Sequence, residues 1–113
     1  YGQALAKLRD EGVLIIGSGL SYHNLRQFYP QPLVTNPDSV AFDDWLTDAA
    51  TDTDGRNDKL AQWLKVPTAR AVHPTSEHLL PMMIAAGAAT GDQGEQIYSD
   101  IVLGKAVSGY RFG

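Results

Sequence analysis

The chain contains no cysteine. This absence excludes disulfide bonds and thiolate ligands together, so any bound metal would be held by histidine, aspartate or glutamate. It also fits a reducing compartment, and we expect a cytoplasmic protein. No apolar run approaches the ~20 residues that span a bilayer, and no signal peptide is visible. A membrane is therefore not an expected partner.

Positive charge is scarce as well. The 113 residues include 9 Lys and Arg against 13 Asp and Glu, which gives a net charge of −4. The basic residues are scattered, whereas phosphate binding needs clustered Lys and Arg, so nucleic acid is not an expected partner. The length and the apolar fraction of 43% fit one globular domain at most. Because Tyr1 enters directly into a helical pattern, we expect a fragment whose preceding part is missing.

The hydrophobic pattern predicts an α/β fold with helices packed on a mixed sheet. A helix closed by Gly12 precedes the aliphatic run 13–16, which predicts a buried, parallel strand. Pro81 should lie in the first turns of an apolar helix that is buried on every face. The expected elements are, in order, a helix over 1–11, a strand over 13–16, a short helix over 22–29 stopped by Pro30 and Pro32, a helix starting at 36–38, an acidic loop over 48–58, a short helix around 60–64, an extended stretch over 72–74, a helix over 76–89, and one or two strands within 94–113.

His23 is the first candidate for chemistry. It follows the expected strand and its glycine turn, and ligand crevices of open α/β sheets form at the carboxyl ends of strands. An imidazole exchanges protons near neutral pH, and its neutral form binds metals. The alternative is a histidine that only hydrogen-bonds within a turn.

His73 and His78 form the second candidate group, with Glu77 between them. On one regular helix a spacing of five would place the two rings about 140° apart, so they could not face one metal. However, Pro74 keeps His73 out of the helix that starts near His78. The alternative is a helix cap, with Thr75 or Ser76 bonding the first amides and Glu77 favouring the helix dipole.

Two further patterns indicate little. Gly17 and Gly19 after a strand are typical of a dinucleotide turn, but the third glycine is absent because Tyr22 occupies its place. The acidic loop lacks the residue order and the closing Glu of a calcium-binding EF-hand, so solvation explains it better.

Three segments together resemble one family. They are IIGSGLSYHNLR at 15–26, HPTSEHLLP at 73–81 and GYRF at 109–112. They resemble the C-terminal half of class III extradiol ring-cleaving dioxygenases of the DOPA-dioxygenase type. The resemblance implies that residues 1–113 are the C-terminal part of a single catalytic domain whose N-terminal part is missing.

The resemblance also implies an oxidoreductase that cleaves a catechol ring with O₂ at a non-haem metal. Fe(II) is the expected metal, with Zn(II) as the alternative. His23 matches the family's active-site histidine, which acts as an acid–base near the bound catecholate or lies close enough to be counted a metal ligand. His78 matches the metal ligand that this half contributes. His73 and Glu77 are candidates for supporting a ligand or contacting substrate.

The family's other histidine ligands have no counterpart in this chain. We therefore expect it to be inactive without its missing half or a partner chain. A homo-oligomer remains open. The alternative is a non-catalytic α/β module for binding or interaction that keeps the fold without the metal site.

Overall fold

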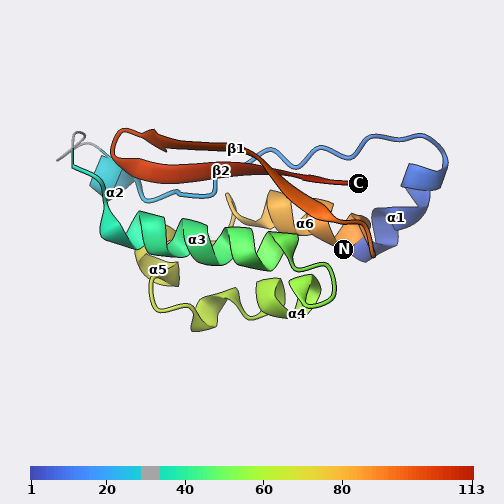
Figure 1. Ribbon diagram of the computed structural model, residues 1–113, viewed down its shortest axis with the longest axis horizontal. Coiled ribbons are helices and arrows are strands. Elements are labelled where there is room, and N and C mark those ends of the chain that lie inside the picture. The colour runs from blue at the N-terminus through green and yellow to red at the C-terminus, as the bar shows by residue number, and fades with distance from the viewer. Residues whose placement is uncertain (29–33) are drawn as a thin grey trace.

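The computed structural model describes residues 1–28 and 34–113. The α/β fold predicted from the sequence is confirmed (Figure 1). The elements are α1 (Gly2–Asp10), α2 (Leu25–Phe28), α3 (Pro37–Thr51), α4 (Arg56–Ala61), the 3-10 helix η1 (Trp63–Lys65), α5 (Ala69–Val72), α6 (Leu80–Ala88), β1 (Gly94–Val102) and β2 (Lys105–Phe112).

The strands β1 and β2 form an antiparallel hairpin. The turn residues Leu103 and Gly104 have φ angles of 49° and 76°. Positive φ at both central residues defines the type I′ turn that matches the twist of two paired strands. In Figure 1 the hairpin lies along α3, and α4 and α5 lie on the other side of α3.

Helix α3 begins where the sequence predicted. The side chain of Asn36 accepts a hydrogen bond from the Ser39 amide at 2.8 Å, and Pro37 occupies the first turn. The Ser39 hydroxyl in turn accepts a bond of 3.0 Å from the Ala106 amide of β2. The start of α3 is therefore fixed to the hairpin.

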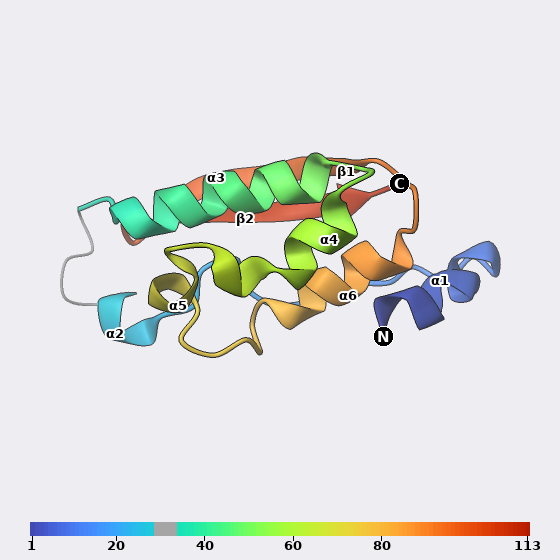
Figure 2. The same cartoon turned by 90° about the horizontal axis from the view of Figure 1, so that it is seen from below.

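The core lies between α3, the α5 region and the start of α6. In Figure 2, which views the molecule from below, α5 lies beside α3, and α4 lies between α3 and α6. Helix α1 packs against α6 through two glycines, because a Cβ on Gly87 would lie 3.1 Å from the Gly2 Cα. The core residues are Tyr22, Phe42, Leu46, Ala49, Leu60, Trp63, Ala69, Val72, Leu79, Ala86 and Val107.

The predicted parallel strand over 13–16 is wrong for this chain. The segment is extended but pairs with no strand among the described residues, and Leu14 and Ile16 are 80% and 78% exposed. A strand exists only through hydrogen bonds to a neighbour, and the local sequence cannot supply that neighbour. The preceding helix and its closure at Gly12, with φ of +79°, are confirmed.

The predicted helix over 76–89 begins later than expected, at Leu80, and is not buried on every face. Pro81 lies in its first turn, as predicted. Leu80 is 44% exposed and most of the helix is only half-buried. The apolar composition of α6 predicts burial. In the described structure its main neighbour is α1, with fewer contacts from α4 and β2, and part of the helix stays uncovered.

Three smaller boundaries also differ. The acidic stretch 48–58 is helical at both ends, because α3 runs to Thr51 and α4 starts at Arg56. Lys59 pairs with Asp48 at 2.7 Å and with Asp52 at 3.0 Å across the turn between them. Val72 belongs to α5 rather than to an extended stretch. The short helix predicted over 22–29 is seen at Leu25–Phe28, and its predicted stop at Pro30 and Pro32 lies outside the described residues. Within the described ranges, no helix is long and apolar enough to cross a membrane.

Candidate functional site

The two principal histidines meet, although 55 positions separate them in the chain. The rings of His23 and His78 are stacked, with their centroids 3.4 Å apart and an angle of 11° between their planes. His23 precedes α2, and His78 lies in the turn that leads into α6. Both side chains are half-buried. The pair therefore lies at the surface of the core, open on one side.

Backbone hydrogen bonds hold the pair together. The Leu20 amide donates to the His78 carbonyl at 3.0 Å, and the His23 amide donates to the Val72 carbonyl at 3.1 Å. The side chain of Asn24 donates to the Ala71 carbonyl at 2.7 Å. The segment 20–24 is thus attached both to α5 and to the turn before α6.

His73 supports the same segment from inside. It is fully buried, and its Nε2 lies 2.9 Å from the Ser21 carbonyl oxygen. A carbonyl only accepts, so Nε2 carries the proton and Nδ1, which has no partner, is the unprotonated nitrogen. The ring packs edge-on against Phe42 and Trp63, with centroids 5.3 and 6.2 Å away. The His73 side chain therefore lies in the protein interior.

Burial lowers the pKa of His73, and the neighbouring charges of His23 and His78 lower it further, while the bond to Ser21 acts in the opposite direction. The neutral ring is therefore favoured, since a second ring proton would find no acceptor.

Glu77 is exposed, and the structure does not place it against the histidine rings by a hydrogen bond. Its pKa is lowered, first by the hydroxyl of Thr75, then by its own backbone amide and by the charges of His78 and His23. Helix α6 starts after Leu79 with no side-chain cap. The cap considered as an alternative for this motif is therefore wrong.

Gly17 and Gly19 serve a packing role that the sequence did not reveal. A Cβ at Gly17 would collide with the carbonyl oxygen of Pro81, and one at Gly19 would collide with that of His78. The two glycines let the segment 13–20 lie directly against the start of α6. Close packing thus explains a spacing that had suggested a dinucleotide turn.

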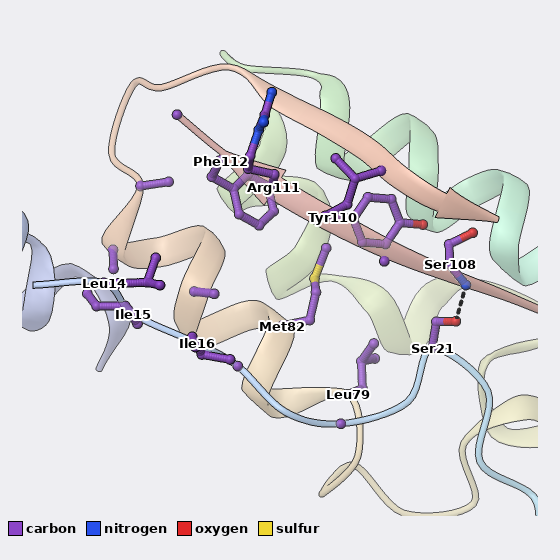
Figure 3. A pocket seen from close by; sticks show the side chains of 18 of the residues that line it. Leu14, Ile15, Ile16, Ser21, Leu79, Met82, Ser108, Tyr110, Arg111 and Phe112 are labelled. Atoms are coloured by element: carbon purple, nitrogen blue, oxygen red, sulfur yellow. Dashed lines mark hydrogen bonds between the residues drawn. The ribbon is translucent and has the colours of Figure 1, made fainter.

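Beside the histidines runs an apolar groove with a volume of about 730 Å³ (Figure 3). One wall is the segment 13–20, the other is the end of β2, and Leu79 and Met82 form part of the floor. His78 also lines it. The walls are joined at one end, where the Ser108 amide donates to the Ser21 hydroxyl at 2.8 Å.

Polar groups of α3 and β2 complete this wall, and sequence reasoning missed Asp43, Thr47 and Ser108. The Ser108 hydroxyl donates to the buried carboxylate of Asp43 at 2.8 Å, and burial raises the pKa of Asp43. The Tyr110 hydroxyl lies 2.8 Å from that of Thr47, and burial raises the pKa of Tyr110 to about 12. No local pattern links α3 to β2, so only the fold could reveal these contacts.

The described residues contain no group of three or more histidine, aspartate or glutamate side chains placed to hold a metal. His78 nevertheless has a buried Nδ1 without a partner, which leaves a nitrogen donor available. Catalytic metal sites generally use at least three protein ligands. The two histidines could therefore form only part of such a site.

A family model described as the catalytic LigB subunit of aromatic ring-opening dioxygenase matches residues 1–110. The chain belongs to this family, and the resemblance found in the sequence is confirmed.

The chain is also similar to two curated plant proteins named 4,5-DOPA dioxygenase extradiol. It is 43% identical to the Beta vulgaris protein over 89 residues, which are 78% of this chain and 32% of that protein. It is 36% identical to the Mirabilis jalapa protein over 110 residues, which are 96% and 40%. The chain thus spans less than half the length of these relatives.

A crystal structure of an uncharacterized protein from Escherichia coli K12 has the same fold. The TM-score is 0.85 at 26% identity, and the match covers 99% of this chain and 48% of that one. The arrangement described above is therefore about half of a larger structure in that protein.

Proposed function

We propose that this chain supplies part of the active site of an extradiol dioxygenase, which cleaves a catechol-type ring with O₂ at a non-haem metal. The observation that carries the proposal is the stacked pair of His23 and His78, attached by backbone bonds beside an open groove. The family match and the names of the plant relatives support the reaction class.

His78 would hold the metal, with Fe(II) as the expected ion and Zn(II) as the alternative. Its unpartnered nitrogen is the donor that this role needs. When bound, the metal would supply the Lewis-acid and redox chemistry of ring opening. Residues outside this chain's match to its relatives would supply the remaining ligands. Residues 1–113 would then be the C-terminal part of a single catalytic domain.

His23 would move protons. Its ring lies 3.4 Å from the ring of the proposed ligand, so a catechol bound beside His78 would present its hydroxyl groups to His23. A neutral imidazole can accept a hydroxyl proton and later return it to the opened product. His73 would position His23 from behind through the Ser21 carbonyl, and Glu77 would keep a negative charge near the pair.

The test uses a chimera in which the portion of the Beta vulgaris relative left uncovered by the match is joined ahead of Tyr1. We expect about one equivalent of metal and oxygen uptake with at least one of a panel of catechols under added Fe(II). His78→Ala should lose the metal, whereas His23→Ala should keep most of it and lose turnover. Leu64→Ala, at a side chain 53% exposed on η1, is the matched control.

Release of the metal by His23→Ala would show that His23 is chiefly a metal ligand. A folded chimera that consumes no oxygen with any catechol would exclude the dioxygenase proposal and favour a non-catalytic binding module.

A further inference from the structure

The segment 20–24, which carries His23, is attached mainly to one other part of the chain. Four of its hydrogen bonds run to residues 71–78. A fifth bond reaches the hairpin instead, because the Ser108 amide of β2 donates to the Ser21 hydroxyl at 2.8 Å (Figure 3). Among the residues that the structure describes, no other hydrogen bond joins this segment to either strand. The position of the segment relative to the hairpin therefore depends on the direction of the Ser108 amide.

The strand pairing around Ser108 is irregular. The register between β1 and β2 shifts between Gln96 and Tyr98, which marks a β-bulge. Gly109, the residue after Ser108, is the partner of Tyr98. A bulge disrupts the ladder locally and increases the twist of the strands. Pairing with β1 alone therefore holds the Ser108 amide less firmly than a regular ladder would.

A buried carboxylate on α3 fixes the side chain of Ser108. The Ser108 hydroxyl donates to Oδ2 of Asp43 at 2.8 Å and accepts a bond of 2.9 Å from the Gln96 side chain. Asp43 is only 8% exposed, whereas Gln96 is exposed. The hydroxyl and the amide belong to one residue, so a hydroxyl anchored to α3 also sets the direction in which the amide points.

Stability alone does not explain why a carboxylate occupies this position. Oδ1 of Asp43 is buried without a hydrogen-bond partner, and no Lys or Arg of the described residues pairs with the carboxylate. Burial raises the pKa of Asp43, while the bond from Ser108 acts in the opposite direction. A buried carboxylate with an unpaired oxygen opposes folding. The one hydrogen bond that this side chain makes in the described structure, to Ser108, is therefore its distinctive contribution.

We propose that Asp43 is a positioning residue of the histidine site. Its carboxylate holds the Ser108 hydroxyl, and the Ser108 amide holds Ser21. Ser21 lies two positions before His23 in the same attached segment. Through this series of contacts Asp43 keeps the His23 ring stacked on the ring of His78. The inference rests on the proposed function only for its effect on turnover, because the stacking itself can be measured in the chain alone.

The alternative is that Asp43 only joins α3 to the hairpin. Thr47 makes a parallel contact, because its hydroxyl lies 2.8 Å from that of Tyr110. Residues four apart on a helix lie on the same face, so Asp43 and Thr47 link the same helix to the same strand. Neither Thr47 nor Tyr110 bonds to the segment 20–24 in the described structure. Thr47 therefore offers a matched control.

The first measurement is proton NMR of the chain alone. Stacked rings shift each other's proton resonances and give a nuclear Overhauser effect between them. Asp43→Ala should move the ring resonances of His23 and His78 toward those of the urea-unfolded chain and remove this effect. Asp43→Asn keeps an oxygen that can accept the Ser108 proton, so it should keep the stack. Thr47→Val should also keep the stack, although it too removes a bond between α3 and β2.

A second variant tests the same series of contacts from its other end. Ser21→Ala removes the acceptor of the Ser108 amide but keeps the carbonyl that His73 holds. It should reproduce the loss of stacking seen with Asp43→Ala. The double variant should be no worse than either single variant, because the two side chains act in one series. Ser21→Ala also decides the question if Asp43→Ala does not fold.

The second measurement is turnover in the chimera described above. Asp43→Ala should lower kcat at least about 10-fold and change KM less than about 3-fold, because a misplaced proton-transfer group affects the chemical step more than binding. Asp43→Asn and Thr47→Val should both stay within about 3-fold of the parent kcat.

Three outcomes would overturn the proposal. They are retained stacking in folded Asp43→Ala and Ser21→Ala, a loss of stacking by Thr47→Val as large as that by Asp43→Ala, and equal damage by Asp43→Asn and Asp43→Ala, which would assign the effect to charge rather than to the bond with Ser108. Loss of stacking by Asp43→Ala together with a parent chimera that takes up no oxygen would support the positioning role and count against the proposed function, so the two can fail separately.

Discussion

Two neighbouring segments of the chain differ in how many of their hydrogen bonds the described structure supplies. The segment 20–24 donates or accepts hydrogen bonds to α5 and to the turn before α6 at four points, and Tyr22 is fully buried. The segment 13–19 just before it is ordered by two glycines, but its amides from 14 onward donate no bond within the described structure.

The difference separates two parts of one proposed site. The histidine pair is organised by contacts that this chain makes with itself. The groove beside it is bounded by the segment 13–19 and the end of β2, and Leu14 and Ile16 in this segment are 80% and 78% exposed. Within one chain, one segment can therefore be held by its own hydrogen bonds while the segment next to it stays exposed.

Among the substitutions considered, removal of the His73 side chain should change the stability of the chain most. His73→Ala deletes a buried ring and its bond to Ser21, and we expect a loss of about 3 kcal/mol in the free energy of unfolding. Urea denaturation of the chain would measure it. His73→Gln, whose amide can still donate to Ser21, should recover part of the loss, and Leu64→Ala should change stability by less than about 0.5 kcal/mol. A loss below about 1 kcal/mol for His73→Ala would mean that this ring does not hold the segment.

The pH dependence of stability should show a smaller effect from the same residue. The pKa of His73 is lowered in the folded state, so between that pKa and the usual value of about 6.5 the unfolded chain binds the proton and the folded chain does not. This contribution is present above pH 6.5 and is lost as the pH falls below it, by at most about 1.4 kcal/mol per pH unit.

The measurement is urea denaturation of the chain at pH 7.5, 6.5 and 5.5, compared with His73→Gln. The variant should lose less stability than the parent over this range. Parallel pH profiles for the two proteins would contradict the buried, neutral state of His73.

Substitutions in the segment 13–19 should have the smallest effect on the stability of the chain alone. Leu14→Ser and Ile16→Ser remove side chains that are already largely exposed, so each should change stability by less than about 0.5 kcal/mol. In the chimera each should cost more than about 1 kcal/mol, because both side chains would then be buried. Thermal or urea denaturation of both proteins gives the comparison, and equal costs in the two would remove the distinction between the segments.

Much of the local structure could be predicted from the sequence. Asn36 and Pro37 fixed the start of α3, Gly12 followed α1, and Pro81 lay in the first turn of α6, because caps and restricted backbone angles depend on a few adjacent residues. The motifs around His23 and His78 identified the family for the same reason, since they are short and contiguous.

Only the tertiary structure decided how these pieces meet. It stacked His23 on His78, buried His73 behind them, exposed Glu77, and showed that Gly17 and Gly19 serve close packing. It also left the aliphatic run 13–16 without the neighbouring strand that its pattern predicts. Local sequence sets the conformation that a segment prefers, but ring stacking, burial and strand pairing depend on partners distant in the chain.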